Sequence, residues 1–267
     1  MQIQQIIKEL EAWAPLPFQE SYDNAGLLVG DPEQICKGVL CSLDCTDKVV
    51  EEAIEKGCNL IVSHHPIIFK GIKQLQAGHY ITRVIQKAIQ HNIAIYAIHT
   101  NLDNIIDGVN KSLADRLHLE KRRILDPKPG ITDKNGEKIG SGLVGELPLE
   151  TDPKAFLIWV KEKFNLTTLK HTQIPDKQLK TIALCGGSGS FLLGAVKAQE
   201  IDCFITSDLK YHEFFEADGK YLLVDIGHGE SEQFVPALIL AYLTSKFPTF
   251  AVLQSLVNTQ PVTYLKD

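Results

Sequence analysis

Short apolar runs alternate with helix-like segments in the first half of the chain, and this alternation constrains the fold more than any other feature. The runs are apolar along their whole length, as expected for strands that are covered on both faces. Such strands, alternating with helices, predict a parallel sheet with helices on both sides and therefore an α/β fold. The strand-like runs are residues 38–44, 59–63 and 93–98, and the helix-like segments are residues 46–56 and 79–91.

The same alternation returns in the second half, with strand-like runs at residues 181–185, 203–206 and 221–225. Two pairs of segments also match in detail, which predicts an internal repeat of a β-α-β-α-β unit. The alternative, which one sequence leaves open, is two unrelated units with the same order of elements. The matching segments are 59–65 with 202–208, and 99–103 with 228–232.

The segment between the halves has a different composition. Residues 126–142 contain two prolines, four glycines and many polar side chains, so we expect a domain boundary or an exposed loop. A strand is predicted at 143–147 and a helix at 152–164, with Asp152 as its cap.

Metal-ligand residues follow three of the apolar runs directly. Because the carboxyl ends of parallel strands meet at one edge of a sheet, we expect these side chains to converge. Imidazole and carboxylate donors without thiolate suit Zn²⁺, Fe²⁺, Mn²⁺, Co²⁺ or Ni²⁺ and do not choose among them. The alternative is a set of unrelated polar residues at strand ends. The candidate ligands are His64, His65, His99, Asp103, His228 and Glu232.

Charge and cysteine content exclude some functions. The formal net charge of −6 argues against a general nucleic-acid-binding protein, which would present a basic surface. No segment predicts a signal peptide or a membrane span, so we expect a cytoplasmic protein. The six cysteines form no C-x-x-C pair. Buried thiols are favoured for them over a structural zinc site.

Two further sites are weaker candidates. Gly186, Gly187 and Ser188 follow a strand and are predicted to bind a phosphate, although glycine turns here often serve only tight packing. His212 is predicted to shuttle a proton, and the alternative is an exposed histidine at a helix start. Asp44 lies at a strand end and is expected to orient a metal-binding side chain by a hydrogen bond.

Four motifs together resemble the GTP cyclohydrolase 1 type 2 homolog family, the NIF-three-like dinuclear metal-binding proteins, and the similarity extends over residues 1–267. The resemblance implies a dinuclear metal site formed by the six candidate ligands. The motifs are Asp23-Asn24-Ala25-Gly26-Leu27, Ser63-His64-His65-Pro66, His99-Thr100-Asn101-Leu102-Asp103 and Gly227-His228-x-x-x-Glu232.

The resemblance also implies an architecture. Two three-layer αβα lobes with largely parallel sheets are expected, the second inserted in the middle of the first. The first lobe, residues 1–124 plus 226–267, would contain most metal ligands, and residues 125–225 would form the inserted lobe. Members form toroidal homohexamers with metal sites facing an interior cavity. Many bacterial members carry a further inserted domain, and this chain resembles the minimal form.

Two functions follow from the resemblance. The first is a metal-dependent hydrolase that uses a metal-bridging hydroxide and two divalent ions per chain. Its small, possibly anionic substrate would be a GTP-like purine, another cyclic amidine or amide, or a phosphoester. The second is a non-catalytic scaffold or regulator in which metal orders an oligomer or a protein partner, or is itself trafficked. The family name does not establish GTP as the substrate.

Overall fold

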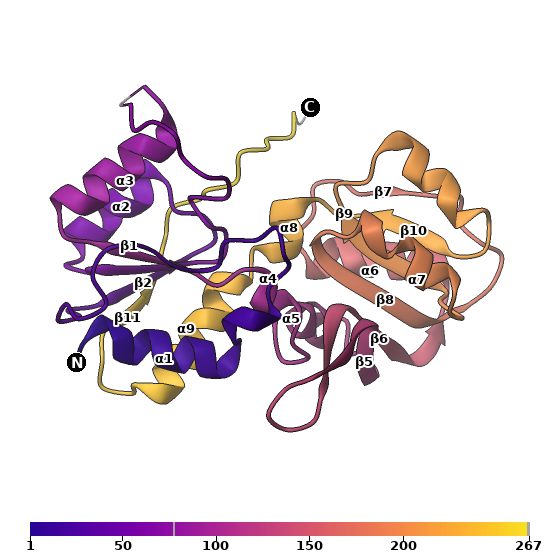
Figure 1. Ribbon diagram of the computed structural model, residues 1–267. Helices are drawn as coiled ribbons and strands as arrows, with labels where there is room; N and C mark the ends of the chain where they lie inside the picture. The colour runs from indigo at the N-terminus through magenta and orange to yellow at the C-terminus, as the bar shows by residue number, and fades with distance from the viewer. Residues whose placement is uncertain (77, 266–267) are drawn as a thin grey trace. The chain divides into compact units, whose positions relative to one another are not determined.

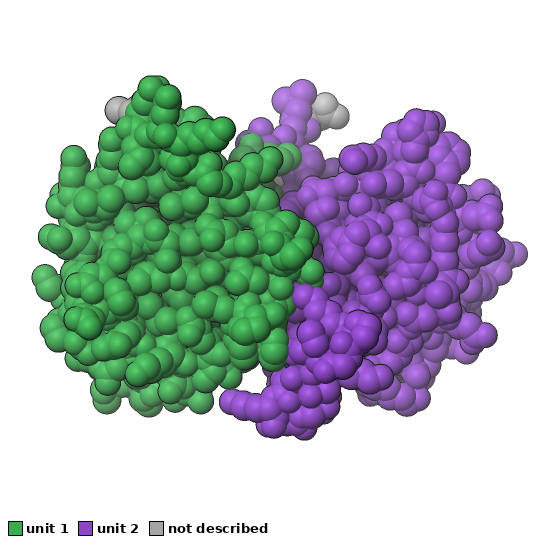
Figure 2. Space-filling model, viewed as in Figure 1, with its two compact units in different colours: residues 1–102, 234–262 green, residues 103–233, 263–267 purple. Residues whose placement is uncertain are grey.

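The computed structural model describes residues 1–76 and 78–265. The chain divides into two compact units, coloured green and purple in Figure 2. Unit 1 is residues 1–102 and 234–262, and unit 2 is residues 103–233 and 263–267. The domain boundaries expected at residues 124/125 and 225/226 stay a prediction.

Unit 1 is built on a five-stranded sheet in the order β1-β4-β3-β2-β11. The last four strands in this order pair in parallel, and β1 joins the edge antiparallel. Every residue of β2, β3 and β4 is buried, which explains why these runs are apolar throughout. The strands are β1 (Gly26–Val29), β2 (Val39–Ser42), β3 (Leu60–Ser63), β4 (Ala94–Ala97) and β11 (Val252–Gln254).

Helices cover both faces of this sheet (Figure 1). α2 (Asp47–Glu55) and α3 (Tyr80–Gln90) pack their apolar sides on one face, in a common core with Leu40, Ile61 and Ile95. α1 (Ile3–Trp13) and α9 (Val235–Lys246) contact each other, and α9 contacts β2 and β11. A short 3₁₀ turn, η1 (Leu16–Phe18), follows α1.

Unit 2 contains a six-stranded sheet in the order β5-β6-β8-β9-β10-β7. Its central strands β8, β9 and β10 are parallel, whereas β5, β6 and β7 pair antiparallel at the two sides. The strands are β5 (Glu120–Thr132), β6 (Lys138–Thr151), β7 (Lys170–His171), β8 (Leu179–Ser188), β9 (Cys203–Ser207) and β10 (Leu222–Asp225).

Short helical segments cover this second sheet. α7 and η3 share a core with Ala183, Phe204 and Leu223, while α5 contacts β6 and β8. Trp159 of α6 meets the ring of His118 just after α5, so these two helices are neighbours. The segments of unit 2 are α5 (Val109–Arg116), α6 (Pro153–Lys163), η2 (Ser190–Leu192), α7 (Leu193–Lys197), η3 (Tyr211–Ala217) and α8 (His228–Glu232). The one-turn helix α4 (Thr100–Asp103) contains the last residues of the first segment of unit 1 and the first residue of unit 2.

The predicted fold class is confirmed: both units are α/β, with parallel strands at the centre of each sheet and helices on both sides. Local details agree as well. Asp152 caps α6 by accepting the N–H of Ala155, and Thr46 caps α2 by accepting the N–H of Val49. All six cysteines are buried free thiols, as expected. Burial raises the pKa of Cys36 to about 11.

The expectation of a loop at 126–142 is wrong, because most of this segment belongs to the β5–β6 hairpin. Residues of β5 are largely exposed, and β5 is an edge strand that tolerates its prolines. Gly140 is required there: a Cβ on it would lie 2.1 Å from the carbonyl oxygen of Asp126. At the hairpin turn, the carboxylate of Asp133 accepts the N–H groups of Asn135 and Glu137.

No helix in the described part of the chain combines the length and the apolar character needed to span a bilayer.

We expect Asp202→Asn to lower the free energy of unfolding of unit 2 by about 2 kcal/mol at pH 7. Its carboxylate accepts the N–H groups of Lys180 and Thr181 and the Nζ of Lys177, which ties β8 to the start of β9. Burial alone would raise the pKa of Asp202, but these bonds outweigh it and lower the pKa. The stabilisation is therefore full above the ordinary aspartate pKa of about 4 and disappears as pH falls through the lowered value.

Urea unfolding from pH 7 downward checks this expectation. The gap between wild type and variant should narrow below about pH 4. Asp218→Asn, at an exposed carboxylate, is the matched control and should change stability by less than about 0.5 kcal/mol. A gap that stays constant with pH would contradict the assignment to this carboxylate.

Candidate metal centre

Three imidazoles lie together at the carboxyl edge of the unit 1 sheet. His64 and His65 follow β3, and His99 follows β4, its parallel neighbour. One potential ligand atom from each of the three side chains lies within 4.8 Å of the others. Their ring centroids are 5.0–5.5 Å apart. The parallel register of β3 and β4 therefore produces the convergence that the sequence predicted for these three residues.

The backbone around these histidines continues the sheet past the ends of the strands. The N–H groups of His64 and His65 donate to the carbonyls of Ser42 and Leu43, and the N–H of Ile98 donates to the carbonyl of Ser63. The strand exits are therefore tied to one another by main-chain hydrogen bonds. This arrangement limits how far the three imidazoles can move apart.

Each of the three imidazoles has its Nδ1 engaged by an oxygen atom. His64 Nδ1 lies 2.8 Å from the carbonyl oxygen of Ile98, His65 Nδ1 lies 2.8 Å from Asp44 Oδ1, and His99 Nδ1 lies 2.7 Å from Asp23 Oδ1. A carbonyl or carboxylate oxygen only accepts, so Nδ1 carries the proton in each ring. Nε2 then keeps its lone pair, as in metal-binding histidines whose other nitrogen is oriented by an outer contact.

Asp23, the first residue of one of the four family motifs, contacts Nδ1 of His99, a role that the sequence did not indicate. Its Oδ1 also accepts the N–H of Asn24 at 2.7 Å. The carboxylate also accepts the N–H of Thr100 at 3.0 Å, and its side chain is fully buried. Burial alone would raise the pKa of Asp23, but the hydrogen bond and charge of His99 and the bond from Thr100 lower it to about 2.

Asp44 has the supporting role that the sequence indicated. Its Oδ1 contacts His65, and its Oδ2 accepts the hydroxyl of Thr259 at 2.6 Å. Both oxygens are therefore fixed by partners from different parts of unit 1. The orientation of the His65 ring depends on this carboxylate.

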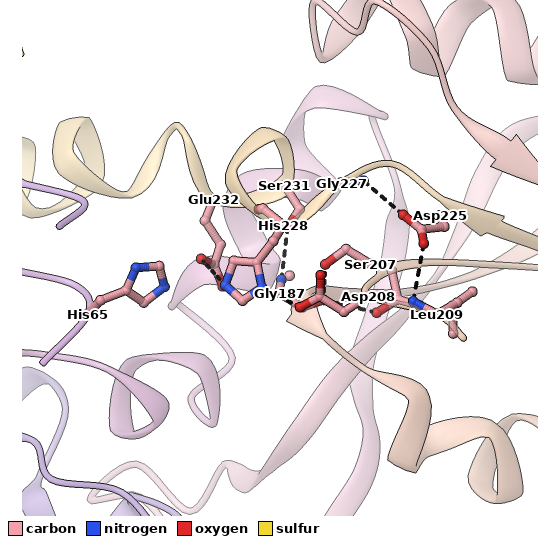
Figure 3. Close-up of polar contacts among 12 residues, drawn as sticks. His65, Gly187, Ser207, Asp208, Leu209, Asp225, Gly227, His228, Ser231 and Glu232 are labelled. Atoms are coloured by element: carbon pink, nitrogen blue, oxygen red, sulfur yellow. Dashed lines mark hydrogen bonds and ion pairs between the residues drawn. The ribbon is translucent and has the colours of Figure 1, made fainter. Parts of the chain in front are cut away.

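A second group of candidate ligands lies in unit 2, on α8 directly after β10. His228 and Glu232 are one helical turn apart, and His228 Nε2 lies 3.1 Å from Glu232 Oε2. His228 Nδ1 lies 2.6 Å from Asp208 Oδ2, so this imidazole also has an aspartate on Nδ1, while its Nε2 faces the Glu232 carboxylate (Figure 3). Glu232 is 3% exposed. The pattern found in unit 1 is repeated here.

The segment that the sequence predicted to follow a strand, Gly186–Ser188, is the end of β8 and packs against α8. Gly187 N–H donates to Ser231 Oγ at 2.9 Å, and Gly186 N–H donates to Asn110 Oδ1 at 2.9 Å. A Cβ on Gly187 would lie 2.4 Å from Glu232 Oε1. The glycine at position 187 therefore leaves room for the Glu232 carboxylate, and phosphate binding by Gly186, Gly187 and Ser188 stays a prediction.

Asp103, at the end of α4, and Glu232 both act on the buried thiol of Cys185 in β8. Burial raises the pKa of this thiol, and the negative charges of Asp103 and Glu232 raise it further. Unit 2 therefore contributes one imidazole and two carboxylates.

His212 lies elsewhere in unit 2, on η3. It is exposed, and its ring contacts those of Tyr211 and Phe215 at centroid distances of 5.2 and 6.2 Å. Its proposed role as a proton shuttle stays a prediction.

The donor set fits a divalent transition metal. Unit 1 offers three imidazoles whose Nε2 atoms keep their lone pairs, and unit 2 offers one imidazole and two carboxylates. Zn²⁺, Fe²⁺, Mn²⁺, Co²⁺ and Ni²⁺ all accept such nitrogen and oxygen donors. The structure therefore contains His/Glu groups that could bind metal.

Known proteins share both the sequence and the fold. A relative from Clostridium acetobutylicum, named GTP cyclohydrolase 1 type 2 homolog, is 34% identical over 233 residues, covering 87% of this chain and 85% of the relative. A Campylobacter jejuni relative of the same name is 35% identical over 235 residues, 88% of each chain. The alignment with a Staphylococcus epidermidis relative extends over 367 residues at 27% identity, so that protein contains additional residues within the aligned span.

Solved structures agree over nearly the whole chain. A Bacillus cereus protein related to NIF3 superposes with a TM-score of 0.92 over 99% of both chains at 22% identity, a likeness of fold alone. A hypothetical protein from Staphylococcus aureus gives a TM-score of 0.88 over 99% of both chains at 31% identity. The sequence model of the Duf34/NIF3 (NGG1p interacting factor 3) family matches residues 1–261. The chain therefore belongs to the Duf34/NIF3 family.

Proposed function

We propose that this protein binds two divalent metal ions per chain and is a metal-dependent hydrolase. The observation that carries the metal assignment is the aspartate on Nδ1 of His65, His99 and His228, which leaves each Nε2 available as a ligand. The proposed ligands are His64, His65 and His99 of unit 1 and Asp103, His228 and Glu232 of unit 2.

Charge supports a small anionic substrate. Asp103 and Glu232 are the proposed carboxylate ligands, and they offset only part of the charge of two divalent ions. A surplus of positive charge favours a phosphate or another anion. When bound, such ions polarise carbonyl or phosphoryl oxygens and lower the pKa of water.

The relatives' name, GTP cyclohydrolase 1 type 2 homolog, supports hydrolysis of a cyclic amidine or amide, with a phosphoester as the other class. His212 is the proposed proton shuttle, and the end of β8 at Gly186–Ser188 is the proposed phosphate contact. We also propose a cytoplasmic homohexamer, which mass determination in solution would test.

Reconstituted protein should contain about two metal ions per chain by elemental analysis, as the proposed ligand set requires. It should also hydrolyse at least one member of a panel of nucleotides, cyclic amides and phosphoesters. His65→Ala should lose metal and lower turnover by at least about 100-fold, because it removes a ligand nitrogen. His91→Ala, at an exposed histidine after α3, is the matched control and should behave as wild type.

Two outcomes would contradict these proposals separately. Absence of metal after reconstitution would end the metal assignment. Stoichiometric metal without turnover on any substrate would end the hydrolase assignment and favour the scaffold or regulator.

Gly187→Ala should weaken metal binding by about 10- to 100-fold. The new Cβ would meet the Glu232 carboxylate, and the backbone of Gly187 has φ +63°, which a side chain disfavours. Competition with a chromophoric chelator measures the affinity. Gly194→Ala, on α7 with nothing within 4 Å of the added carbon, is the control and should bind as wild type. Equal affinities for the two variants would refute the role of Gly187.

A further inference from the structure

Asp225 is a buried carboxylate at the end of β10 and is not among the proposed metal ligands. It is 2% exposed, and both of its oxygens are engaged. Oδ1 accepts the N–H of Gly227 at 3.1 Å (Figure 3). Oδ2 accepts the N–H of Leu209 at 3.1 Å and the Nζ of Lys170 at 2.6 Å. The carboxylate therefore joins three separate segments of unit 2.

Two of these segments carry the pair that orients the candidate ligand His228. Leu209 directly follows Asp208 in the loop after β9, and Gly227 directly precedes His228 in the turn after β10. Asp225 thus bonds the backbone next to both members of the Asp208–His228 pair. The separation of the two loops sets whether the 2.6 Å contact between Asp208 Oδ2 and His228 Nδ1 can form.

The loop after β9 needs such support, because Asp208 has φ +57°, a conformation that is costly for a residue other than glycine. Gly227 has φ +88°, which glycine adopts readily. Hydrogen bonds to a buried, charged acceptor are stronger than those between neutral groups. Asp225 accepts one from Leu209, next to Asp208, and one from Gly227, next to His228.

In unit 1 a single carboxylate both orients the imidazole and bonds the neighbouring backbone. Asp23 contacts His99 Nδ1 directly and also accepts the N–H of Thr100. In unit 2 the task is divided, because Asp208 contacts the imidazole while a separate carboxylate fixes the backbone. If the predicted pairing of residues 99–103 with 228–232 is continued toward the N-terminus, Asp225 pairs with the buried Tyr96, which has no carboxylate.

We propose that Asp225 is a positioning residue for the unit 2 metal ligands: it fixes the Asp208–His228 pair and thereby holds Nε2 of His228 beside the Glu232 carboxylate, the two ligand groups that a metal ion would bind. The proposal rests on the proposed metal-binding function. In this role Asp225 acts through the backbone of the two loops and is not itself a metal ligand. Lys170 compensates the charge of the buried carboxylate.

The test is Asp225→Asn in the full chain. An asparagine at this position keeps the size of the side chain but replaces one acceptor oxygen by an N–H₂ donor, so one loop loses its bond. Zn²⁺ affinity, measured by competition with a chromophoric chelator, should fall about tenfold. This is the smallest loss that is typical when a residue that orients a metal ligand is mutated.

A second readout uses metal-free protein and so does not depend on the proposed function. Nitrogen NMR of the imidazoles, at a pH about two units above the ordinary histidine pKa, reports which nitrogen of His228 carries the proton. Wild type should show the proton on Nδ1, where the Asp208 carboxylate accepts it. Asp225→Asn should show the proton partly shifted to Nε2, which faces the Glu232 carboxylate, because Asp208 no longer stays in place.

Asp202→Asn is the matched control, since it removes a carboxylate of the same unit that also ties backbone segments together. It should lower stability but leave both the Zn²⁺ affinity and the His228 tautomer as in wild type. If Asp225→Asn fails to fold, Asp225→Ser, whose side chain is neutral and smaller, replaces it in both measurements.

The outcomes separate the two proposals. Wild-type protein that binds no Zn²⁺ would refute the metal assignment, and the tautomer measurement would still decide the role of Asp225. An unchanged His228 tautomer in the Asp225 variant would overturn the proposal, as would equal losses of Zn²⁺ affinity in the Asp225 and Asp202 variants.

Discussion

The hydrogen bond between an imidazole Nδ1 and a carboxylate is the interaction on which the candidate centre depends. An unrestrained imidazole exchanges between two tautomers and rotates about its side chain, so neither nitrogen is reliably available. In this protein His65, His99 and His228 each have an aspartate at Nδ1 within 2.8 Å. The same bond fixes the ring, selects the tautomer and raises the basicity of Nε2, which are three requirements of a metal ligand.

The fold makes these bonds possible by placing strand exits side by side. Parallel pairing of β3 with β4, and of β9 with β10, delivers residues distant in sequence to one edge of each sheet. The fully buried strands keep the residues at these exits in place, because an apolar strand that is covered on both faces has little freedom to shift register. A short helix follows two of these exits: His99 directly precedes α4, which ends at Asp103, and His228 begins α8, which ends at Glu232.

Sequence alone predicted the parts of this arrangement that follow from local pattern. Apolar runs identified β2, β3, β4, β8, β9 and β10, and residues 143–147 in the middle of β6. The rest of the β5–β6 hairpin was predicted as a loop or boundary, because β5 is largely exposed and both strands contain proline and glycine. Ligand candidates were recognised by residue type at strand ends. Asp23 and Asp208 were not recognised as their partners, because they lie 76 and 20 residues from the histidines they contact, and no spacing rule connects residues that meet only through the fold.

The two halves of the ligand set differ in how firmly they are organised. In unit 1 the carboxylate of Asp23 is fully buried, so its bond to His99 forms in a low-dielectric environment and resists competition from water. In unit 2 the side chains of Asp208 and His228 are 48% and 39% exposed, where water and salt weaken the same bond. A solvated pair keeps its geometry only if the backbone beneath it is rigid. The buried Asp225 carboxylate bonds the backbone beside both members of this pair, which is the support that its proposed positioning role requires.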